Sequence, residues 1–263
     1  MHWDGSTVII TGASRGIGRA VALAGAARGA RVGLIARDES DLRSVLAETG
    51  DRGAFAVADV ADPTALGAAI DKIEAELGPA DVLVANAGIG AYGAFADIAS
   101  EEIERIVRVN VLGTAHAIRA VTPGMIERRR GHIVTIGSIA GRIGSPFEAI
   151  YSATKFAGVG LTEALVVELE PYGIGVSMVN PGPVATHFGE ARGHPYDRPS
   201  PKPVPAEQVA TAVIKAVEGN RHEQYVPRSF RGAVVIRHLI PPIFRLGSKK
   251  SFTRELAADR AKR

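Results

Sequence analysis

The sequence predicts an α/β domain in which a doubly wound parallel sheet of about seven strands carries helices on both faces. Three observations predict it. Short β-branched runs alternate with helix-favouring segments along most of the 263 residues. The strand runs are continuously apolar, which is typical of strands buried on both sides. The apolar fraction of 46% and the chain length suit one large globular domain with a substantial core.

The elements follow one another in strict alternation. Each strand is a short apolar run, and each helix is a longer stretch that favours helix formation. The predicted strands cover residues 7–11, 31–36, 54–58, 81–85, 132–136, 174–179 and 224–226. The predicted helices cover residues 16–28, 40–49, 63–77, 100–127, 151–168 and 205–217. We therefore expect a single domain over residues 1–227.

Residues 187–205 interrupt this alternation. They hold five prolines, at positions 195, 199, 201, 203 and 205, and show no periodicity. A long irregular loop in a compact domain is usually a lid or a binding loop. We expect this segment to be a substrate lid, with a disordered insertion as the alternative.

Residues 228–263 form a basic, partly apolar extension. Residues 226–263 carry a net charge of +8, whereas the whole chain carries +3, so the rest of the chain carries −5. The stretch Gly232–Gly247 mixes apolar residues with Arg237 and Arg245, and Pro241 and Pro242 interrupt any long helix. Three alternatives stay open for this extension: contact with an anionic membrane surface, a cover over the substrate mouth, or contact with another subunit. A basic terminus that only aids solubility is the simplest explanation of the charge.

Several classes of function are excluded by composition. The chain has no cysteine, which excludes disulfides, thiolate metal sites and a cysteine nucleophile. The first residues show no secretory signal, and no apolar run has the length of a membrane span. We expect a cytoplasmic protein, with peripheral membrane association as the alternative, and no metal site or nucleic-acid partner.

A glycine-rich turn joins the first strand to the first helix. Gly12, Gly16 and Gly18 allow the backbone to turn tightly and to approach a pyrophosphate at the helix N-terminus, together with Ser14, Arg15 and Ile17. With the alternating elements, this turn predicts a Rossmann-type domain that binds a dinucleotide. The same residues match the Gly-x-Ser-x-Gly elbow of serine hydrolases. Only one strand precedes Ser14, which disfavours the hydrolase interpretation.

Three side chains have the chemistry of a proton donor site. Tyr151 and Lys155 are four residues apart, so on a helix they share one face. A nearby ammonium is expected to lower the pKa of the phenol, which could then protonate an oxygen that gains charge as hydride reaches its carbon. Ser138 could hold the same oxygen by a hydrogen bond.

These motifs, in this order, resemble those of the short-chain dehydrogenase/reductase superfamily, in its compact single-domain branch. The resemblance runs from about residue 7 to residue 226. One departure is Ala85, where the family commonly has a second asparagine before Asn86. The motifs that carry it are Thr11–Gly18, Asp59-Val60, Asn86-Ala87-Gly88, Asn110, Ser138, Tyr151–Lys155 and Pro181-Gly182.

The resemblance implies a role for each matched residue. Tyr151 is the expected acid/base, Lys155 tunes it and holds the nicotinamide ribose, and Ser138 binds the substrate oxygen. Asn110 is expected to anchor a water of a proton relay near Lys155. The remaining cofactor contacts implied by the family are Asp59 and Val60 at the adenine, Asn86, Ala87 and Gly88 along the crevice, and Pro181, Gly182, Val184 and Thr186 at the carboxamide.

The end of the second strand predicts which nicotinamide cofactor is used. A carboxylate there binds the ribose hydroxyls of NAD and repels the extra phosphate of NADP. This chain has Ala36 followed by Arg37, and Arg15 lies in the glycine-rich turn, so two guanidinium groups could hold the 2′-phosphate. We expect NADP(H), with NAD(H) as the alternative if the strand extends to Asp38.

The predicted function is therefore hydride transfer between NADP(H) and a carbonyl/alcohol pair, with a hydrophobic substrate such as a lipid, acyl or sterol-like ketone. A 3-oxoacyl-thioester reductase and a non-catalytic NADP-binding regulator are the alternatives. The resemblance also implies a homodimer or homotetramer that pairs through the helices predicted at 100–127 and 151–168.

Overall fold

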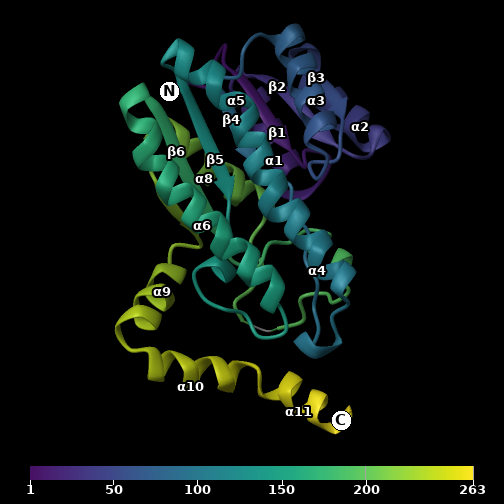
Figure 1. Cartoon of the computed structure of the whole chain (residues 1–263), viewed down its shortest axis with the longest axis vertical. Helices are drawn as coiled ribbons and strands as arrows, with labels where there is room; N and C mark the ends of the chain where they lie inside the picture. The colour runs from purple at the N-terminus through teal and green to yellow at the C-terminus, as the bar shows by residue number, and fades with distance from the viewer. Residues whose placement is uncertain (199, 263) are drawn as a thin grey trace.

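The computed structural model describes residues 1–198 and 200–262 and shows one seven-stranded, all-parallel sheet with the strand order β3-β2-β1-β4-β5-β6-β7 (Figure 1). The predicted doubly wound fold is confirmed. The strands are β1 (Thr7–Thr11), β2 (Arg31–Ala36), β3 (Gly53–Val57), β4 (Val82–Ala85), β5 (Gly131–Ile136), β6 (Ile174–Pro181) and β7 (Glu223–Val226).

Helices cover both faces of this sheet. The helices of the body are α1 (Gly16–Ala26), α2 (Glu39–Thr49), α3 (Pro63–Leu77), α4 (Ser100–Val107), α5 (Thr114–Arg128), α6 (Ala149–Leu169), α7 (Phe188–Ala191) and α8 (Ala206–Glu218). The short helical turns are η1 (Gly50–Arg52), η2 (Phe95–Asp97), η3 (Arg108–Gly113), η4 (Ile139–Gly141) and η5 (Glu170–Tyr172), of which η3 is a π-helix.

The period-2 geometry of the strands divides the core in two. In β1, Val8 and Ile10 pack with α1, α2 and α8 on one face, and Ile9 packs with α3 and α5 on the other. Because both faces are covered, every residue of β1 is buried. This explains the continuous apolar run in the sequence.

The helix predicted over residues 100–127 is not one regular helix. It consists of α4, the π-helical η3 and α5 in succession. Two contacts accompany the π turn. Asn110 is brought to the loop after β4, and Gly113 passes so close to Val60 that a Cβ at position 113 would lie 2.7 Å from its Cγ2. Hydrophobic periodicity does not distinguish a π turn from an α turn, so the prediction missed it.

The C-terminal extension forms three helices, α9 (Phe230–Leu239), α10 (Pro241–Ser251) and α11 (Thr253–Lys262). The break between α9 and α10 falls at Ile240, directly before the two prolines that predict it. In Figure 1 these helices (yellow) extend from the body, and α10 crosses beneath it. None of the described helices combines the length and the apolar composition needed to cross a bilayer.

Candidate active site

A cavity of about 950 Å³ lies at the carboxyl ends of β1, β4, β5 and β6. Parallel α/β sheets bind their ligands at this edge. Fifteen of the predicted site residues line the cavity, which therefore brings together the glycine-rich turn and the expected proton donor residues. They are Gly12, Ser14, Arg15, Gly16, Ile17, Asn86, Ala87, Gly88, Ser138, Tyr151, Lys155, Pro181, Gly182, Val184 and Thr186. Five predicted residues do not line it: Gly18, Arg37, Asp59, Val60 and Asn110.

The N-terminus of α1 opens on this cavity. Its cap residue, Arg15, makes no side-chain cap, and no acidic residue occupies the first turn. By contrast, Asp38 caps α2 and Asp62 caps α3. The uncapped N–H groups and the positive end of the α1 dipole are thus available to an anion, which fits a dinucleotide pyrophosphate.

The glycines keep this end of the cavity open. Gly12 and Gly16 have φ values of +65° and +52°, which favour glycine. A Cβ at Gly18 would lie 2.2 Å from the carbonyl oxygen of Gly12. Gly18 therefore serves the site without lining it, because it allows the helix to pack against the turn.

Asn86 holds the glycine-rich turn against β4. Its Nδ2 donates to the carbonyl oxygens of Thr11 (2.9 Å) and Gly12 (3.0 Å). The hydroxyl of Thr11 accepts from the backbone N–H groups of Asn86 and Ala87, at 3.1 Å each. Thr11 was predicted only as the first residue of the glycine-rich motif. Its signal was a hydroxyl at the last position of a buried strand, where a polar side chain needs partners.

Ser138, Tyr151 and Lys155 meet where η4 packs on α6. Ser138 is buried, and its Oγ accepts from the N–H of Ala140 at 3.1 Å. A Cβ at Gly141 would lie 2.7 Å from the carbonyl oxygen of Lys155, so this glycine permits the close approach of the two elements. The Nζ of Lys155 donates to the carbonyl oxygen of Ile136 (2.8 Å) and lies 5.8 Å from the centre of the Tyr151 ring.

Burial dominates the titration of both groups. It raises the pKa of Tyr151 well above its ordinary value, while the hydrogen bond with the Ser138 side chain acts in the opposite direction. Burial also lowers the pKa of Lys155 to about 8. The expected lowering of the Tyr151 pKa is therefore wrong for this geometry, because loss of water around the phenol has the largest effect on it. The phenol keeps its proton at neutral pH, which is the form that a proton donor needs.

Asn110 lies in the π turn, and its side-chain amide forms hydrogen bonds with other residues of the protein. Its Oδ1 accepts from the N–H of Ile89 (2.8 Å), and its Nδ2 donates to the carbonyl oxygen of Ile89 (2.8 Å) and to Oγ1 of Thr154 (3.0 Å). These bonds tie the loop after β4 to α6. The expected water of a proton relay stays a prediction.

Two of the residues expected around the adenine and the 2′-phosphate lie beside a second cavity of about 400 Å³. Arg37 and Asp59 line it, with Nη1 of Arg37 3.9 Å from Oδ2 of Asp59. Val60 is buried beneath Gly113. The strand β2 ends at Ala36, as the sequence predicts, and Asp38 accepts from the N–H of Asp41 as the cap of α2.

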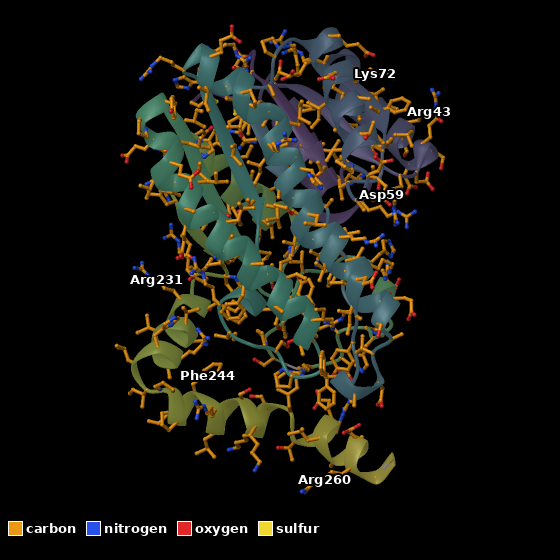
Figure 2. All side chains as sticks on the ribbon, in the orientation of Figure 1. Arg43, Asp59, Lys72, Arg231, Phe244 and Arg260 are labelled. Atoms are coloured by element: carbon orange, nitrogen blue, oxygen red, sulfur yellow. The ribbon has the colours of Figure 1, made fainter. Side chains whose placement is uncertain are left out.

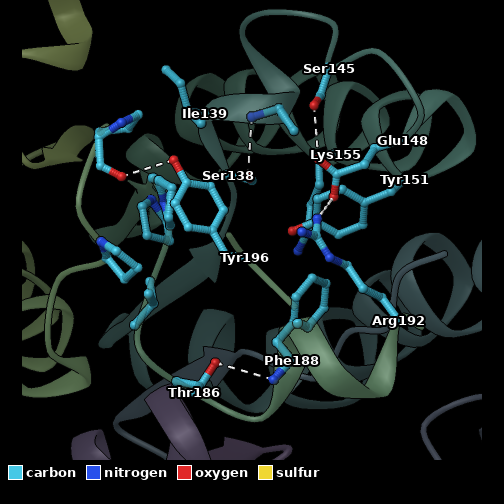
Figure 3. Close-up of a pocket in the computed structure, with 18 of the residues that line it drawn as sticks. Ser138, Ile139, Ser145, Glu148, Tyr151, Lys155, Thr186, Phe188, Arg192 and Tyr196 are labelled. Carbon is cyan, nitrogen blue, oxygen red and sulfur yellow. Dashed lines mark hydrogen bonds and ion pairs between the residues drawn. The ribbon is translucent and has the colours of Figure 1, made fainter. Parts of the chain in front are cut away.

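Segment 187–205, apart from Pro199, which lies outside the described residues, covers the other end of the cavity. It contains α7, and a bridge between Val184 and Val204 closes its base. The Phe188 ring lies 5.4 Å from the Tyr151 ring, and Arg192 forms a largely buried ion pair with Glu148 (Figure 3). Prolines predicted an irregular loop, but no sequence signal identified Phe188, Arg192 or Glu148.

The C-terminal helices complete this end. Phe230 packs on Gly182 so closely that a Cβ there would lie 2.2 Å from the ring. Arg198 pairs with Glu255 at 2.7 Å and stacks 3.5 Å from the centre of the Phe252 ring. The extension therefore borders the mouth of the cavity, and its contact with a membrane surface or with another subunit stays a prediction. The tail residues that line the cavity are Phe230, Ala233, Ile236, Ile243, Phe244, Gly247, Ser248, Ser251 and Phe252.

Comparisons with known proteins agree with this geometry. Residues 6–197 match the family model described as short chain dehydrogenase. The chain is 36% identical over 191 residues to the 3-oxoacyl-[acyl-carrier-protein] reductase FabG of Escherichia coli (strain K12), covering 73% of this chain and 78% of that one. It is 33% identical over 256 residues to dehydrogenase/reductase SDR family member 7B of Xenopus tropicalis, covering 91% and 83%. A solved short chain dehydrogenase/reductase from Burkholderia phymatum, in complex with NAD, superposes with a TM-score of 0.84 at 29% identity, covering 90% and 94%.

Proposed function

Because the chain belongs to the short-chain dehydrogenase/reductase family and is an oxidoreductase of the carbonyl/alcohol type with a nicotinamide cofactor, we propose that it uses NADP(H) to interconvert an apolar ketone and its secondary alcohol. The observation that carries the proposal is the single cavity in which Ser138, Tyr151 and Lys155 meet the uncapped N-terminus of α1.

The chain's own residues supply proton transfer and positioning. The bound nicotinamide supplies or accepts hydride at the carbonyl carbon. In reduction, Tyr151 donates its phenolic proton to the substrate oxygen. Ser138 donates a hydrogen bond to that oxygen, and Lys155 stabilises the phenolate that forms. Buried beside the carbonyl of Ile136, the Lys155 ammonium is well placed to hold a ribose hydroxyl.

Two features support NADP(H) over NAD(H). No carboxylate stands at the end of β2, and Asp38 is already engaged as the cap of α2. Arg37 and Arg15 are both exposed, and Arg15 is oriented by Asp41, with Nε 2.6 Å from Oδ2. Two guanidinium groups at one edge of a dinucleotide site match the charge and geometry of a 2′-phosphate.

The substrate end of the cavity supports an apolar substrate. Beyond Tyr151 its walls are mostly aromatic and aliphatic, from the loop after β4, from α7 and from the C-terminal helices. The charges of the largely buried pair Arg192–Glu148 neutralise each other. Walls of this kind bind a ligand through its hydrocarbon surface and orient it through the few polar groups near the reacting atom.

A 3-oxoacyl-thioester reductase is the second candidate. The identity to FabG supports it. That match covers 191 residues, however. The cavity of this chain also includes nine residues of the C-terminal extension, between Phe230 and Phe252. The two candidates differ in the expected length dependence of the substrate, which the following assay measures.

The assay follows NADPH consumption with methyl ketones from butanone to dodecanone and with acetoacetyl thioesters. We expect kcat/KM to rise with chain length among the ketones, because each buried methylene contributes about 0.8 kcal/mol. Activity confined to the thioesters would favour the second candidate, and no turnover of any carbonyl would favour a cofactor-binding regulator.

Tyr151→Phe tests the mechanism. It removes one hydroxyl and keeps the buried ring, so NADPH binding should persist while kcat falls by about a thousandfold. Tyr172→Phe, at an exposed tyrosine outside the cavity, is the matched control and should retain wild-type kcat. Retention of turnover by Tyr151→Phe would overturn the proposed role.

A further inference from the structure

The segment from Arg228 to Phe252, which contains α9 and α10, combines exposed apolar side chains with positive charge. It carries no Asp or Glu. Its exposed apolar residues are Val235, Ile236, Leu239, Ile240, Ile243 and Leu246, of which Leu239 (76%) and Leu246 (71%) are the most exposed. Its basic residues are Arg228, Arg231, Arg237, Arg245, Lys249 and Lys250. We call this segment the basic hairpin.

The charges of the basic hairpin are not neutralised by the side chains that the structure describes. Among the described residues, none of its six basic side chains forms an ion pair with a carboxylate. The acidic side chains nearby are engaged by the flanking helix and the lid instead: Glu255 pairs with Arg198, and Asp197 pairs with Arg254. The hairpin therefore presents uncompensated positive charge to its surroundings.

The hairpin is held at the mouth of the cavity by its inner face. Phe230 packs on Gly182, and Arg237 stacks 5.1 Å from the centre of the Phe156 ring on α6. Figure 2 shows Phe244 on the side of α10 that faces the body, whereas Arg231 points away from it. Ile236 and Ile243 both line the cavity and are about half exposed, so they form the lip of its mouth.

We propose that the basic hairpin is an interfacial docking surface that rests on an anionic membrane, with the mouth of the cavity against the lipid. Leu239 and Leu246 would enter the interface, and the lysine and arginine side chains would meet anionic headgroups, as in amphipathic segments that lie on bilayers. An apolar substrate could then pass between lipid and cavity across Ile236 and Ile243 without crossing water.

Charge favours this occupant over a second copy of the chain. A two-fold symmetric contact through the outer face of the hairpin would place cations of one copy against cations of the other, and like charges across an interface cost several kcal/mol. An anionic lipid surface satisfies both the exposed apolar area and the positive charge. A head-to-tail contact with the acidic body of another copy is a separate outcome that the experiment distinguishes.

The test is flotation of the full chain with vesicles. We expect it to float with vesicles of three parts phosphatidylcholine and one part phosphatidylglycerol, and to stay behind with phosphatidylcholine alone. Raising the salt to 0.5 M should weaken the binding, because exposed charges are then screened within about 4 Å. Failure of the wild-type chain to float with the anionic vesicles overturns the proposal.

Paired variants assign the binding to the hairpin. Lys249→Glu with Lys250→Glu, and separately Leu239→Ser with Leu246→Ser, should each lower the partition coefficient by at least about tenfold. Two matched controls should float like the wild type: Arg119→Glu with Lys215→Glu, which reverses exposed charges on α5 and α8, and Phe95→Ser, which removes an exposed apolar ring. Circular dichroism melting confirms that each variant is folded.

Three further results decide the remaining cases. Hairpin variants that float like the wild type would overturn the proposal. The proposal would also be overturned if the chain did not bind vesicles and instead formed a salt-sensitive oligomer, detected by sedimentation, that the hairpin substitutions dissociate. Tyr151→Phe should float normally, because flotation does not need turnover; failure of the proposed reaction therefore leaves this test intact.

Discussion

The two ends of the cavity are held together in different ways. At the α1 end the contacts are made by the backbone and by short side chains: glycines at 12, 16 and 18, and the amide of Asn86 on the carbonyls of Thr11 and Gly12. At the α7 end the contacts are made by long side chains from separate segments, such as Glu148 with Arg192 and Arg198 with Glu255.

This difference separates a fixed end from an adjustable one. Backbone groups at the carboxyl ends of parallel strands are positioned by the register of the sheet, so the α1 end is defined by the pairing of β1 with β2 and β4. The α7 end depends on pairs 44 and 57 residues apart in the chain, and each pair can change without disturbing a strand. The geometry suits an invariant cofactor at one end and a substrate-specific surface at the other.

Gly18→Ala is expected to damage the fixed end most. Its Cβ would lie 2.2 Å from the Gly12 carbonyl oxygen and 2.6 Å from Nδ2 of Asn86, so the turn must move away from the N-terminus of α1. Overpacking and loss of charge-assisted phosphate contacts together cost about 4 kcal/mol, or about a thousandfold in NADPH affinity, measured by fluorescence titration.

The matched control for this prediction is Gly67→Ala on α3, where an added Cβ meets nothing within 4 Å. It should bind NADPH normally and raise the free energy of unfolding by up to about 1 kcal/mol, since alanine favours helix. If Gly18→Ala bound NADPH as tightly as the control, the α1 end would not be the phosphate site.

Arg192→Met tests the adjustable end. It leaves Glu148 largely buried without its cation, and the hydroxyl of Ser145 still donates to it at 2.8 Å. An uncompensated buried charge costs about 3 kcal/mol, and local opening of the lid relieves it. Amide hydrogen exchange in residues 187–198 should therefore accelerate by about a hundredfold, while strands β1 and β4 keep their protection.

A double variant and a control variant test whether the buried charge causes the faster exchange. Glu148→Gln combined with Arg192→Met removes both charges and should restore most of the protection. Arg43→Met breaks an exposed pair with Glu39 on α2 and should leave lid exchange unchanged. Unchanged exchange in Arg192→Met itself would mean that this ion pair does not hold the lid.

The sequence predicted the fixed end far better than the adjustable one. The end of β2 at Ala36 and the glycine-rich turn follow from local patterns of apolar and small residues, and the structure has both. Lid contacts such as Phe188 on Tyr151 join segments that only the tertiary fold brings together, so no local pattern reports them. The direction of the Tyr151 pKa was wrong for the same reason, because burial depends on what packs around the phenol.

Arg37→Asp is expected to change cofactor preference, the smallest of the effects predicted here. It tests whether the fixed end includes Arg37, which lines the neighbouring cavity rather than the main one. Replacing the guanidinium with a carboxylate removes the proposed partner of the 2′-phosphate and adds an acceptor for ribose hydroxyls. The ratio of kcat/KM for NADPH to that for NADH should fall by at least about tenfold. Arg43→Asp makes the same charge change on the adjacent helix, so it tests the long-range electrostatic effect of that change without a direct contact with the cofactor. The ratio should stay near the wild-type value. A wild-type preference for NADH, or an unchanged ratio in Arg37→Asp, would assign the ribose contact to another residue. The fixed end would then stop at the glycine-rich turn and would not include Arg37.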